Sequence, residues 1–306
     1  MEGAVEAALE VLGKQLDAFS FPAVKNGGIV VPSAPATSST FLGKEIQHGK
    51  SRQRRPATGA WTGTSFWEGT PRRSGTAFRP GAPRETSSVV IPDLRGQYEN
   101  ELVDVLSAYP GTQFWLEDDG IWLVAESGLL PGLMMKASFV VAVSFVRSAV
   151  RLGGVRAWGF WGCPMVGYSW IGPRHTNFPD GSICAFHPSD GTWQIGDSLI
   201  ELLDLYSLWA VRHLYLRKFG RWPGLQSVPH SYERILELQI DEYCGCENFD
   251  RRYGECCRER DRSLDQVSTA LGFLRHSGGG LRQPPPAIMK FVLERQTPPK
   301  IEKLGI

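Results

Sequence analysis

Residues 197–220, DSLIELLDLYSLWAVRHLYLRKFG, decide how the rest of the chain must fold. The stretch contains no proline, and its only glycine is the last residue. Asp197 can cap the start of a helix and Gly220 can end it. An acidic residue in the early turns and two basic residues in the last turn suit the helix dipole. Apolar side chains wrap most of the circumference, so we predict a long central helix that is buried on several sides.

The residues ahead of this helix predict the sheet on which it packs. Strand-like runs lie at 114–125, 138–145 and 155–161. Asp118-Asp119-Gly120 interrupts the first run, which favours a hairpin between antiparallel strands. Before them, Asp93 is expected to cap a helix that stops near Pro110-Gly111. The predicted fold class is α+β, with an antiparallel meander sheet packed against the central helix.

Four segments are expected along the chain, because the composition changes between them. Residues 1–19 have apolar side chains at spacings of three and four, which predicts an amphipathic helix. Residues 20–90 are basic, rich in Pro, Gly and Ser and poor in apolar periodicity, which predicts a disordered linker. Aromatic residues within that linker are either a docking motif or unconstrained. Residues 91–225 form the α+β domain, and residues 226–306 form a helical region around a cysteine cluster.

Composition limits the classes of function. Of 306 residues, 42% are hydrophobic and 21% are charged, which is enough apolar content for one or two globular domains. A net charge of +1 gives no reason to expect nucleic-acid or membrane binding. The most apolar run, residues 137–146, is about half as long as a spanning helix, and the N-terminus lacks the apolar core of a secretory signal. All six cysteines lie at or after Cys163 and four are clustered, so we expect a reducing, cytoplasmic location.

A second stretch, HTNFPDGSIC at residues 175–184, indicates a reactive cysteine. Its Pro-Asp-Gly sequence favours a tight turn, so Cys184 is expected to emerge from a bend and to be partly exposed. Thiols react as thiolates, which positive or hydrogen-bond-donating neighbours favour. Arg174, His175 and His187 are the neighbours in sequence. Asn177 is expected either to stabilise an oxyanion or to hold the turn.

This stretch resembles the signature of the ubiquitin-conjugating enzymes, which is His-Pro-Asn, a short spacer and Gly-x-Ile-Cys. Its Pro-Asp-Gly-Ser-Ile-Cys is similar to bacterial relatives found in antiphage cyclic-oligonucleotide signalling operons. The resemblance spans about residues 91–225 and continues in His187-Pro188, Trp193 and residues 220–224, GRWPG. Thr176 stands where the family has proline, and the spacer is one residue shorter than in the eukaryotic enzymes.

The resemblance implies a ubiquitin-conjugating-enzyme-like fold and a catalytic Cys184, with Asn177, His175 and His187 beside it. Cys184 would form a thioester with the C-terminus of a partner protein and transfer the acyl group to an amine. The implied donor is a cGAS-like nucleotidyltransferase or a ubiquitin-like protein, in bacterial antiphage defence. The chain has no glycine-rich phosphate loop, so another protein is expected to activate the carboxylate.

Two alternatives belong to other classes of protein. The first is a non-catalytic interaction module in which Cys184 is structural. The second is a cysteine protease or deconjugating enzyme, for which Cys184, His175 or His187, and Asp190 supply the residue types of a nucleophile, a base and an orienting group.

The cysteine cluster predicts a structural zinc site. Cys244-Gly245-Cys246 is followed after nine residues by Cys256-Cys257. Four thiolates are enough to close a tetrahedral site and leave no open position for catalysis. The pattern resembles the SEC-C zinc motif, with a spacer one residue longer than usual. Two disulfides or free thiols are the alternative.

Overall fold

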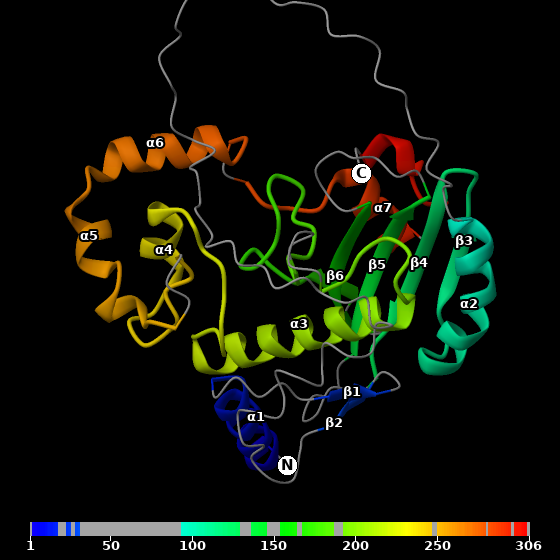
Figure 1. The fold of residues 1–306 in the computed structure, drawn as a ribbon, viewed down its shortest axis with the longest axis horizontal. Helices are drawn as coiled ribbons and strands as arrows, with labels where there is room; N and C mark the ends of the chain where they lie inside the picture. Colours follow the sequence, from blue (N-terminus) through cyan, green and yellow to red (C-terminus); the bar gives the residue numbers. More distant parts are fainter. Residues whose placement is uncertain are drawn as a thin grey trace, which may run out of the picture.

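The computed structural model describes residues 2–17, 23–25, 28–30, 93–128, 136–145, 154–163, 167–186, 192–246, 250–279, 281–294 and 297–304. Within these ranges the fold is mixed α and β, with several helices around a five-stranded antiparallel sheet (Figure 1). The strands are β3 (Gln113–Leu116), β4 (Gly120–Glu126), β5 (Lys136–Ser144), β6 (Val155–Cys163) and β7 (Gly167–Trp170). Each strand pairs with the next in the chain, which confirms the predicted meander; β7 was not predicted.

The two long helices begin and end close to the predicted residues. Helix α2 (Leu94–Ala108) is capped by Asp93, whose carboxylate accepts a hydrogen bond from the Gly96 N–H at 2.9 Å. Helix α3 (Leu199–Phe219) is capped by the hydroxyl of Ser198 rather than by Asp197, and it ends at Gly220 in the left-handed conformation. The sequence therefore predicts the extent of both helices to within a residue or two.

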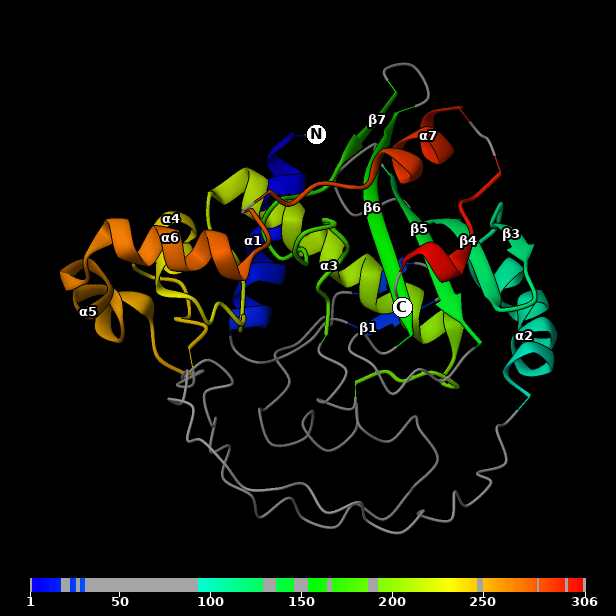
Figure 2. The same cartoon turned by 90° about the horizontal axis from the view of Figure 1, so that it is seen from above.

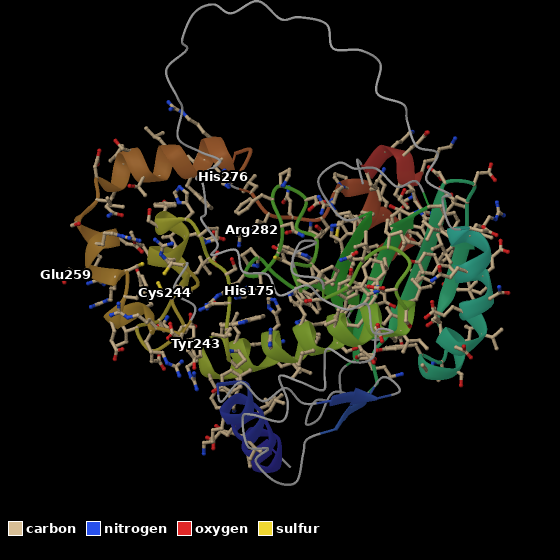
Figure 3. The ribbon with its side chains drawn as sticks, viewed as in Figure 1. His175, Tyr243, Cys244, Glu259, His276 and Arg282 are labelled. Atoms are coloured by element: carbon tan, nitrogen blue, oxygen red, sulfur yellow. The ribbon has the colours of Figure 1, made fainter. Side chains whose placement is uncertain are left out.

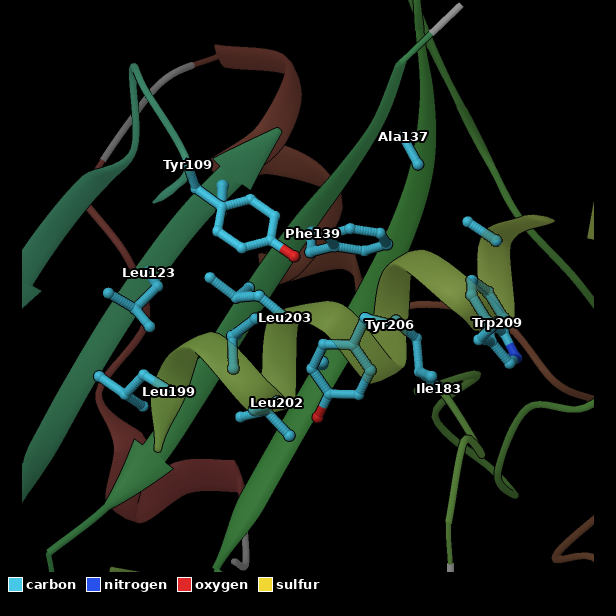
Figure 4. Packing of buried hydrophobic residues seen from close by; sticks show 14 of the residues in the cluster. Tyr109, Leu123, Ala137, Phe139, Ile183, Leu199, Leu202, Leu203, Tyr206 and Trp209 are labelled. Carbon is cyan, nitrogen blue, oxygen red and sulfur yellow. The ribbon is translucent and has the colours of Figure 1, made fainter. Parts of the chain in front are cut away.

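Helix α3 packs across one face of the sheet and forms the main core with it. Figure 4 shows this packing: Leu199, Leu202 and Leu203 of α3 lie against residues of β4 and β5 such as Leu123 and Phe139. Farther along α3, Trp209 lies near Ile183, the residue before Cys184. The segment that carries the cysteine is therefore part of the core.

The opposite face of the sheet is covered by the C-terminal residues. Helix α7 (Pro286–Glu294) and the short 3-10 helix η3 (Ile301–Leu304) pack there through Ile288, Phe291 and Ile301. Figures 1 and 2 show α3 and α7 on opposite sides of β4–β6. Trp122 and Trp158 point to the α7 side, while their neighbours in sequence point to α3. We expected these terminal residues to belong to the zinc-binding region, but they complete the α+β domain.

The N-terminal helix is present and docks on α3. In α1 (Glu2–Asp17), Leu9 and Leu12 are buried in the main core, and the Glu6 carboxylate lies 3.4 Å from Lys218 Nζ of α3. Two short antiparallel strands, β1 (Ala23–Lys25) and β2 (Gly28–Val30), follow it. The prediction of disorder from residue 20 is wrong for these strands. Residues 31–92 lie outside the described part of the chain.

The region around the cysteines is built from short helices. These are α4 (Ser231–Glu237), the 3-10 helix η2 (Tyr253–Glu255), α5 (Arg258–Ser263) and α6 (Gln266–His276). A buried ion pair joins the first of them to α5, because the Arg234 guanidinium donates two hydrogen bonds to the Asp261 carboxylate at 2.7 and 2.8 Å. Across the described residues, the helices are all too short or too polar to span a membrane.

Replacing Phe291 with alanine tests whether α7 holds the sheet. Phe291 is 4% exposed and packs edge-on against Trp115 and Trp122. Phe291→Ala is therefore expected to lower the free energy of unfolding by about 3 to 5 kcal/mol. Leu293→Ala, on the exposed side of the same helix, is expected to change it by less than about 0.5 kcal/mol. Urea denaturation measures both, and equal effects would contradict the docking of α7.

Candidate functional site

Cys184 is exposed on a segment that is fastened to the sheet. Gly181 adopts φ of +62°, which glycine tolerates, and so makes the bend expected of Pro-Asp-Gly. The Ile183 N–H donates to the carbonyl of Ala157 in β6 at 2.7 Å, and the Cys184 N–H donates to the carbonyl of His175 at 3.1 Å. The segment of residues 172–186, here called the Cys184 loop, thus presents its thiol to solvent from a fixed backbone.

Asp180 clamps the turn of this loop to β6. Its carboxylate accepts hydrogen bonds from the Ser182 N–H at 3.0 Å and hydroxyl at 2.8 Å. The same carboxylate lies 3.1 Å from Arg156 Nε, and the Asp180 carbonyl accepts a hydrogen bond from Trp158 Nε1 at 2.8 Å. Since Arg156 and Trp158 both belong to β6, the turn cannot move without breaking bonds to the sheet.

The Asn177 side chain makes its hydrogen bonds within the Cys184 loop. Its Nδ2 donates to Ser182 Oγ at 3.2 Å and to the carbonyl of Ile183 at 3.0 Å. Its backbone makes two further hydrogen bonds across the turn, to Ser182 and from Gly181. This geometry favours the turn-stabilising role. The oxyanion role stays a prediction, because it requires the side chain to release one of these acceptors.

His175 faces the core rather than the thiol. Its backbone has φ of +52°, its ring packs against Trp222 at a tilt of 33° with 3.7 Å between centroids, and its Nε2 lies 3.1 Å from Gln226 Oε1. Its carbonyl also accepts a hydrogen bond from Trp209 Nε1 at 2.9 Å. Burial, reinforced by the charge of Arg174, holds the pKa of His175 well below its usual range. The ring is therefore neutral at pH 7 and serves to hold the loop.

Two further candidates fall outside the part of the chain that the structure describes. They are His187 and Asp190. Their roles stay predictions. Because His175 is directed to Trp222 and Gln226, a cysteine-hydrolase arrangement would have to rely on His187 for its base.

A buried polar network joins the Cys184 loop to the cysteine cluster. The Arg174 guanidinium donates two hydrogen bonds to the Glu242 carboxylate, one of them at 3.0 Å, and one to Gln226 Oε1 at 2.8 Å. Glu242 is fully buried and also accepts a hydrogen bond from the Trp222 N–H at 2.6 Å. Figure 3 labels His175 and Cys244, which border this network on its two sides. Arg174, predicted as a positive neighbour of the thiol, is thus engaged elsewhere.

The four clustered cysteines form a candidate metal centre. Their sulfur atoms all lie within 4.8 Å of one another, with 3.6 Å between Cys246 and Cys256 and 3.7 Å between Cys256 and Cys257. A disulfide bond would need about 2.05 Å. Tetrahedral coordination at about 2.3 Å places sulfurs about 3.8 Å apart. The spacing therefore fits one ion held by Cys244, Cys246, Cys256 and Cys257, and four soft ligands suit zinc.

The backbone around the first two cysteines explains the glycine between them. Gly245 has φ of +70°, and a Cβ atom there would lie 2.6 Å from the backbone nitrogen of Val228. The Val228 N–H instead donates to the Gly245 carbonyl at 2.7 Å. One Arg260 nitrogen lies 3.1 Å from Cys257 Sγ, where its charge favours a thiolate ligand.

Two buried guanidiniums interact with Cys184. Arg156 of β6 and Arg282, which lies before α7, both interact electrostatically with Cys184. Burial lowers the pKa of both guanidiniums, to about 10 for Arg282, and the negative charge of Cys184 opposes this lowering. The interaction is reciprocal, so each guanidinium favours the thiolate over the thiol.

Sequence analysis missed Arg156, Glu242 and Arg282. Arg156 lies in an otherwise apolar strand, where a charged residue is a signal of a buried partner. Glu242, just before the first cysteines, carries no comparable signal. Arg282 lies in a stretch of glycines and prolines that looks like a simple connection, and only tertiary structure brings it to Cys184.

No protein-family model, curated protein or solved structure matches this chain at a significant level. Function is therefore inferred from the geometry of these two sites and from the pattern of the sequence.

Neutralising Glu242 tests the link between the two sites. Glu242→Gln keeps the shape of the side chain but leaves the buried Arg174 with only the more distant Glu237 carboxylate, 3.9 Å from its Nε, so the free energy of unfolding is expected to fall by about 3 to 5 kcal/mol. The control is Glu99→Gln, which breaks the exposed Arg95–Glu99 pair on α2 and is expected to cost no more than about 0.5 kcal/mol. Urea denaturation measures the free energy of unfolding of both variants. A loss of stability for Glu242→Gln as small as that for Glu99→Gln would contradict the network.

The metal centre predicts one zinc ion per chain. Elemental analysis of protein purified without chelator measures this ratio. Cys256→Ser replaces a thiolate with a poorer ligand and is expected to lower the metal content and loosen α4 and α5. Cys163→Ser, outside the cluster, should keep the full zinc content. A Cys256→Ser protein that retains stoichiometric zinc would contradict the assignment.

Proposed function

We propose that this chain is a ubiquitin-conjugating-enzyme-like acyl carrier and transferase. Cys184 would hold the C-terminal carbonyl of a partner protein as a thioester and pass it to an amine. The observation that supports this most is the exposed Cys184 thiol on a rigid loop, in the electrostatic field of Arg156 and Arg282. Reactive cysteines are typically exposed in such electropositive surroundings, whereas structural cysteines are buried.

The reaction would proceed in two balanced steps. In the first, the Cys184 thiolate attacks an activated C-terminal carbonyl, an S–C bond forms, and the activating group leaves with its electron pair. In the second, an amine attacks the thioester, an N–C bond forms, the S–C bond breaks, and Cys184 leaves as a thiolate while the amine loses a proton to solvent or a base. Guanidiniums beside the sulfur favour the thiolate both as nucleophile and as leaving group.

The order of elements supports the fold that the resemblance implies. Helix α2, the antiparallel strands β3–β7, the Cys184 loop and the long helix α3 follow one another as they do in the ubiquitin-conjugating enzymes. We therefore infer a ubiquitin-conjugating-enzyme-like domain, with α7 added on the outer face of its sheet and a zinc knuckle of the SEC-C type beside its active-site loop.

The partners follow from the same proposal. The acyl donor would be a cGAS-like nucleotidyltransferase or a ubiquitin-like protein with a flexible C-terminus, and a separate protein would activate that carboxylate. The acceptor would be an amine on a protein or small molecule, in the bacterial cytoplasm and in antiphage defence. Zinc would be structural, because all four ligand positions are filled by cysteine.

A non-catalytic interaction module is the second candidate, and one observation favours it. Four exposed apolar residues spaced three or four apart lie on α6 and on the two residues just before it. These residues are Leu264, Val267, Leu271 and Leu274. A helix face of this kind suits protein binding. In this case Cys184 would carry no adduct.

A covalent adduct on Cys184 separates the two candidates. Wild-type protein co-expressed with candidate donors is expected to show a species on non-reducing gels that a thiol reagent removes. Cys184→Ser should convert it into a more stable ester or abolish it, because oxygen replaces the thiolate. Cys163→Ser should leave it unchanged. If a thiol-labile species never depends on Cys184, the chain is not an acyl carrier.

A further inference from the structure

Residues 281–285, here called the C-terminal strap, cross over the Cys184 loop. The Gln283 N–H donates to the Pro179 carbonyl at 3.5 Å, and a Cβ atom on Gly181 would lie 2.9 Å from the Gln283 backbone. The Arg282 guanidinium lies 3.9 Å from the centre of the Phe178 ring and donates to the Pro173 carbonyl at 3.2 Å. Figure 3 labels Arg282 between the α6 region and the sheet. The turn therefore has room for the strap because residue 181 is glycine.

The strap lies between α6 and α7, which are distant in sequence from Cys184. Phe273 of α6 packs edge-on against Phe178 of the Cys184 loop, with 5.4 Å between ring centroids. Helix α7 is docked on the sheet through Ile288 and Phe291. Arg282 thus reaches the loop from a segment between an element that packs on the loop and an element that packs on the sheet.

Arg282 is buried between two glutamates of α4 and the Cys184 loop. Its side chain is 6% exposed and pairs with Glu233 and, at 3.1 Å, with Glu237. Its Nε has no hydrogen-bond partner among the described residues. Burial raises the pKa of Glu237 to about 7, with Arg174 opposing and Glu242 adding to the rise, so a large fraction of Glu237 is uncharged at neutral pH. The guanidinium also contacts Phe178 and Pro173 of the loop, so its positive charge lies against the loop as well as against the two glutamates.

A second charged group that interacts with Cys184 is Arg156, which already has a partner within the loop. Its Nε lies 3.1 Å from the Asp180 carboxylate. Tyr206, which also lies near Arg156, is uncharged because burial raises its pKa. Arg156 lies in strand β6, whereas Arg282 lies on the strap. A change in the position of the strap would therefore move the Arg282 guanidinium relative to Cys184 and leave Arg156 in place.

We propose that Arg282 is a positioning residue for the chemistry of Cys184: from the C-terminal strap it holds the loop and supplies the positive charge that favours the Cys184 thiolate. This inference rests on the proposed acyl transfer, for which the thiolate is the reactive form. It makes the reactivity of Cys184 depend on α6 and α7 as well as on the loop itself.

The test measures the thiol directly and needs no acyl donor. The full zinc-loaded chain is alkylated with iodoacetamide over a range of pH, and the Cys184 peptide is quantified by mass spectrometry. The pH midpoint is the readout rather than the rate at one pH, because the nucleophilicity of a thiolate falls as its pKa falls. Arg282→Gln removes the charge, Arg282→Lys keeps it, and Arg275→Gln removes an exposed arginine of α6 as the matched control.

Arg282→Gln is expected to raise the midpoint by about half a unit or more, which is about a threefold loss of thiolate at a pH below both midpoints. Arg282→Lys should restore most of the shift, and Arg275→Gln should cause none. Glu237→Gln in the otherwise unchanged chain should lower the midpoint, which keeps the test decisive if Arg282→Gln does not fold. An unchanged midpoint in folded Arg282→Gln overturns the proposal. If Arg282→Gln does not fold, an unchanged midpoint in Glu237→Gln overturns it. Failure of acyl transfer alone would appear as a normal midpoint shift with no adduct on Cys184.

Discussion

The buried Arg174–Glu242 ion pair is the interaction on which the rest of the site depends. Arg174 precedes His175 at the start of the Cys184 loop, and Glu242 lies two residues before the first metal-binding cysteine. Neither charge is exposed enough to be solvated by water, so each needs the other to remain in the fold. Gln226 satisfies both partners and also donates to the Tyr243 carbonyl at 2.6 Å. The candidate catalytic loop and the candidate metal centre are therefore one structural unit.

The C-terminal residues reinforce this unit from the other direction. They leave the cysteine region through α6, cross the Cys184 loop as the strap, and end on the outer face of the sheet as α7 and η3. The central strands are consequently buried on both faces, which a sheet covered by α3 alone would not require. In this arrangement the cysteine region precedes the strap and would anchor it. Its effect on chemistry at Cys184 would be indirect, through the position of Arg282.

The sequence predicts local structure well here and long-range contacts poorly. Capping by Asp93, the stop at Gly220 and the Asp118–Gly120 hairpin all follow from neighbouring residues, and all are confirmed. The spacing of the four cysteines likewise predicts a cluster, because its members are close along the chain. By contrast, the α7 packing, the Arg174–Glu242 pair and the approach of Arg282 to Cys184 join residues about 70 to 170 positions apart. No periodicity or turn signal encodes such partners.

The distribution of hydrogen bonds around Cys184 indicates how its chemistry is divided among residues. Asn177 and Asp180 donate and accept within the turn, and His175 is neutral and packed on Trp222, so these residues fix the backbone. Charge comes instead from Arg156 and Arg282, and each of them also contacts the loop, at the Asp180 carboxylate and at the Pro173 carbonyl respectively. The two guanidiniums therefore contribute both to the geometry of the loop and to the charge around the thiol. A movement of the strap would accordingly change the contacts that hold the loop together with the reactivity of Cys184.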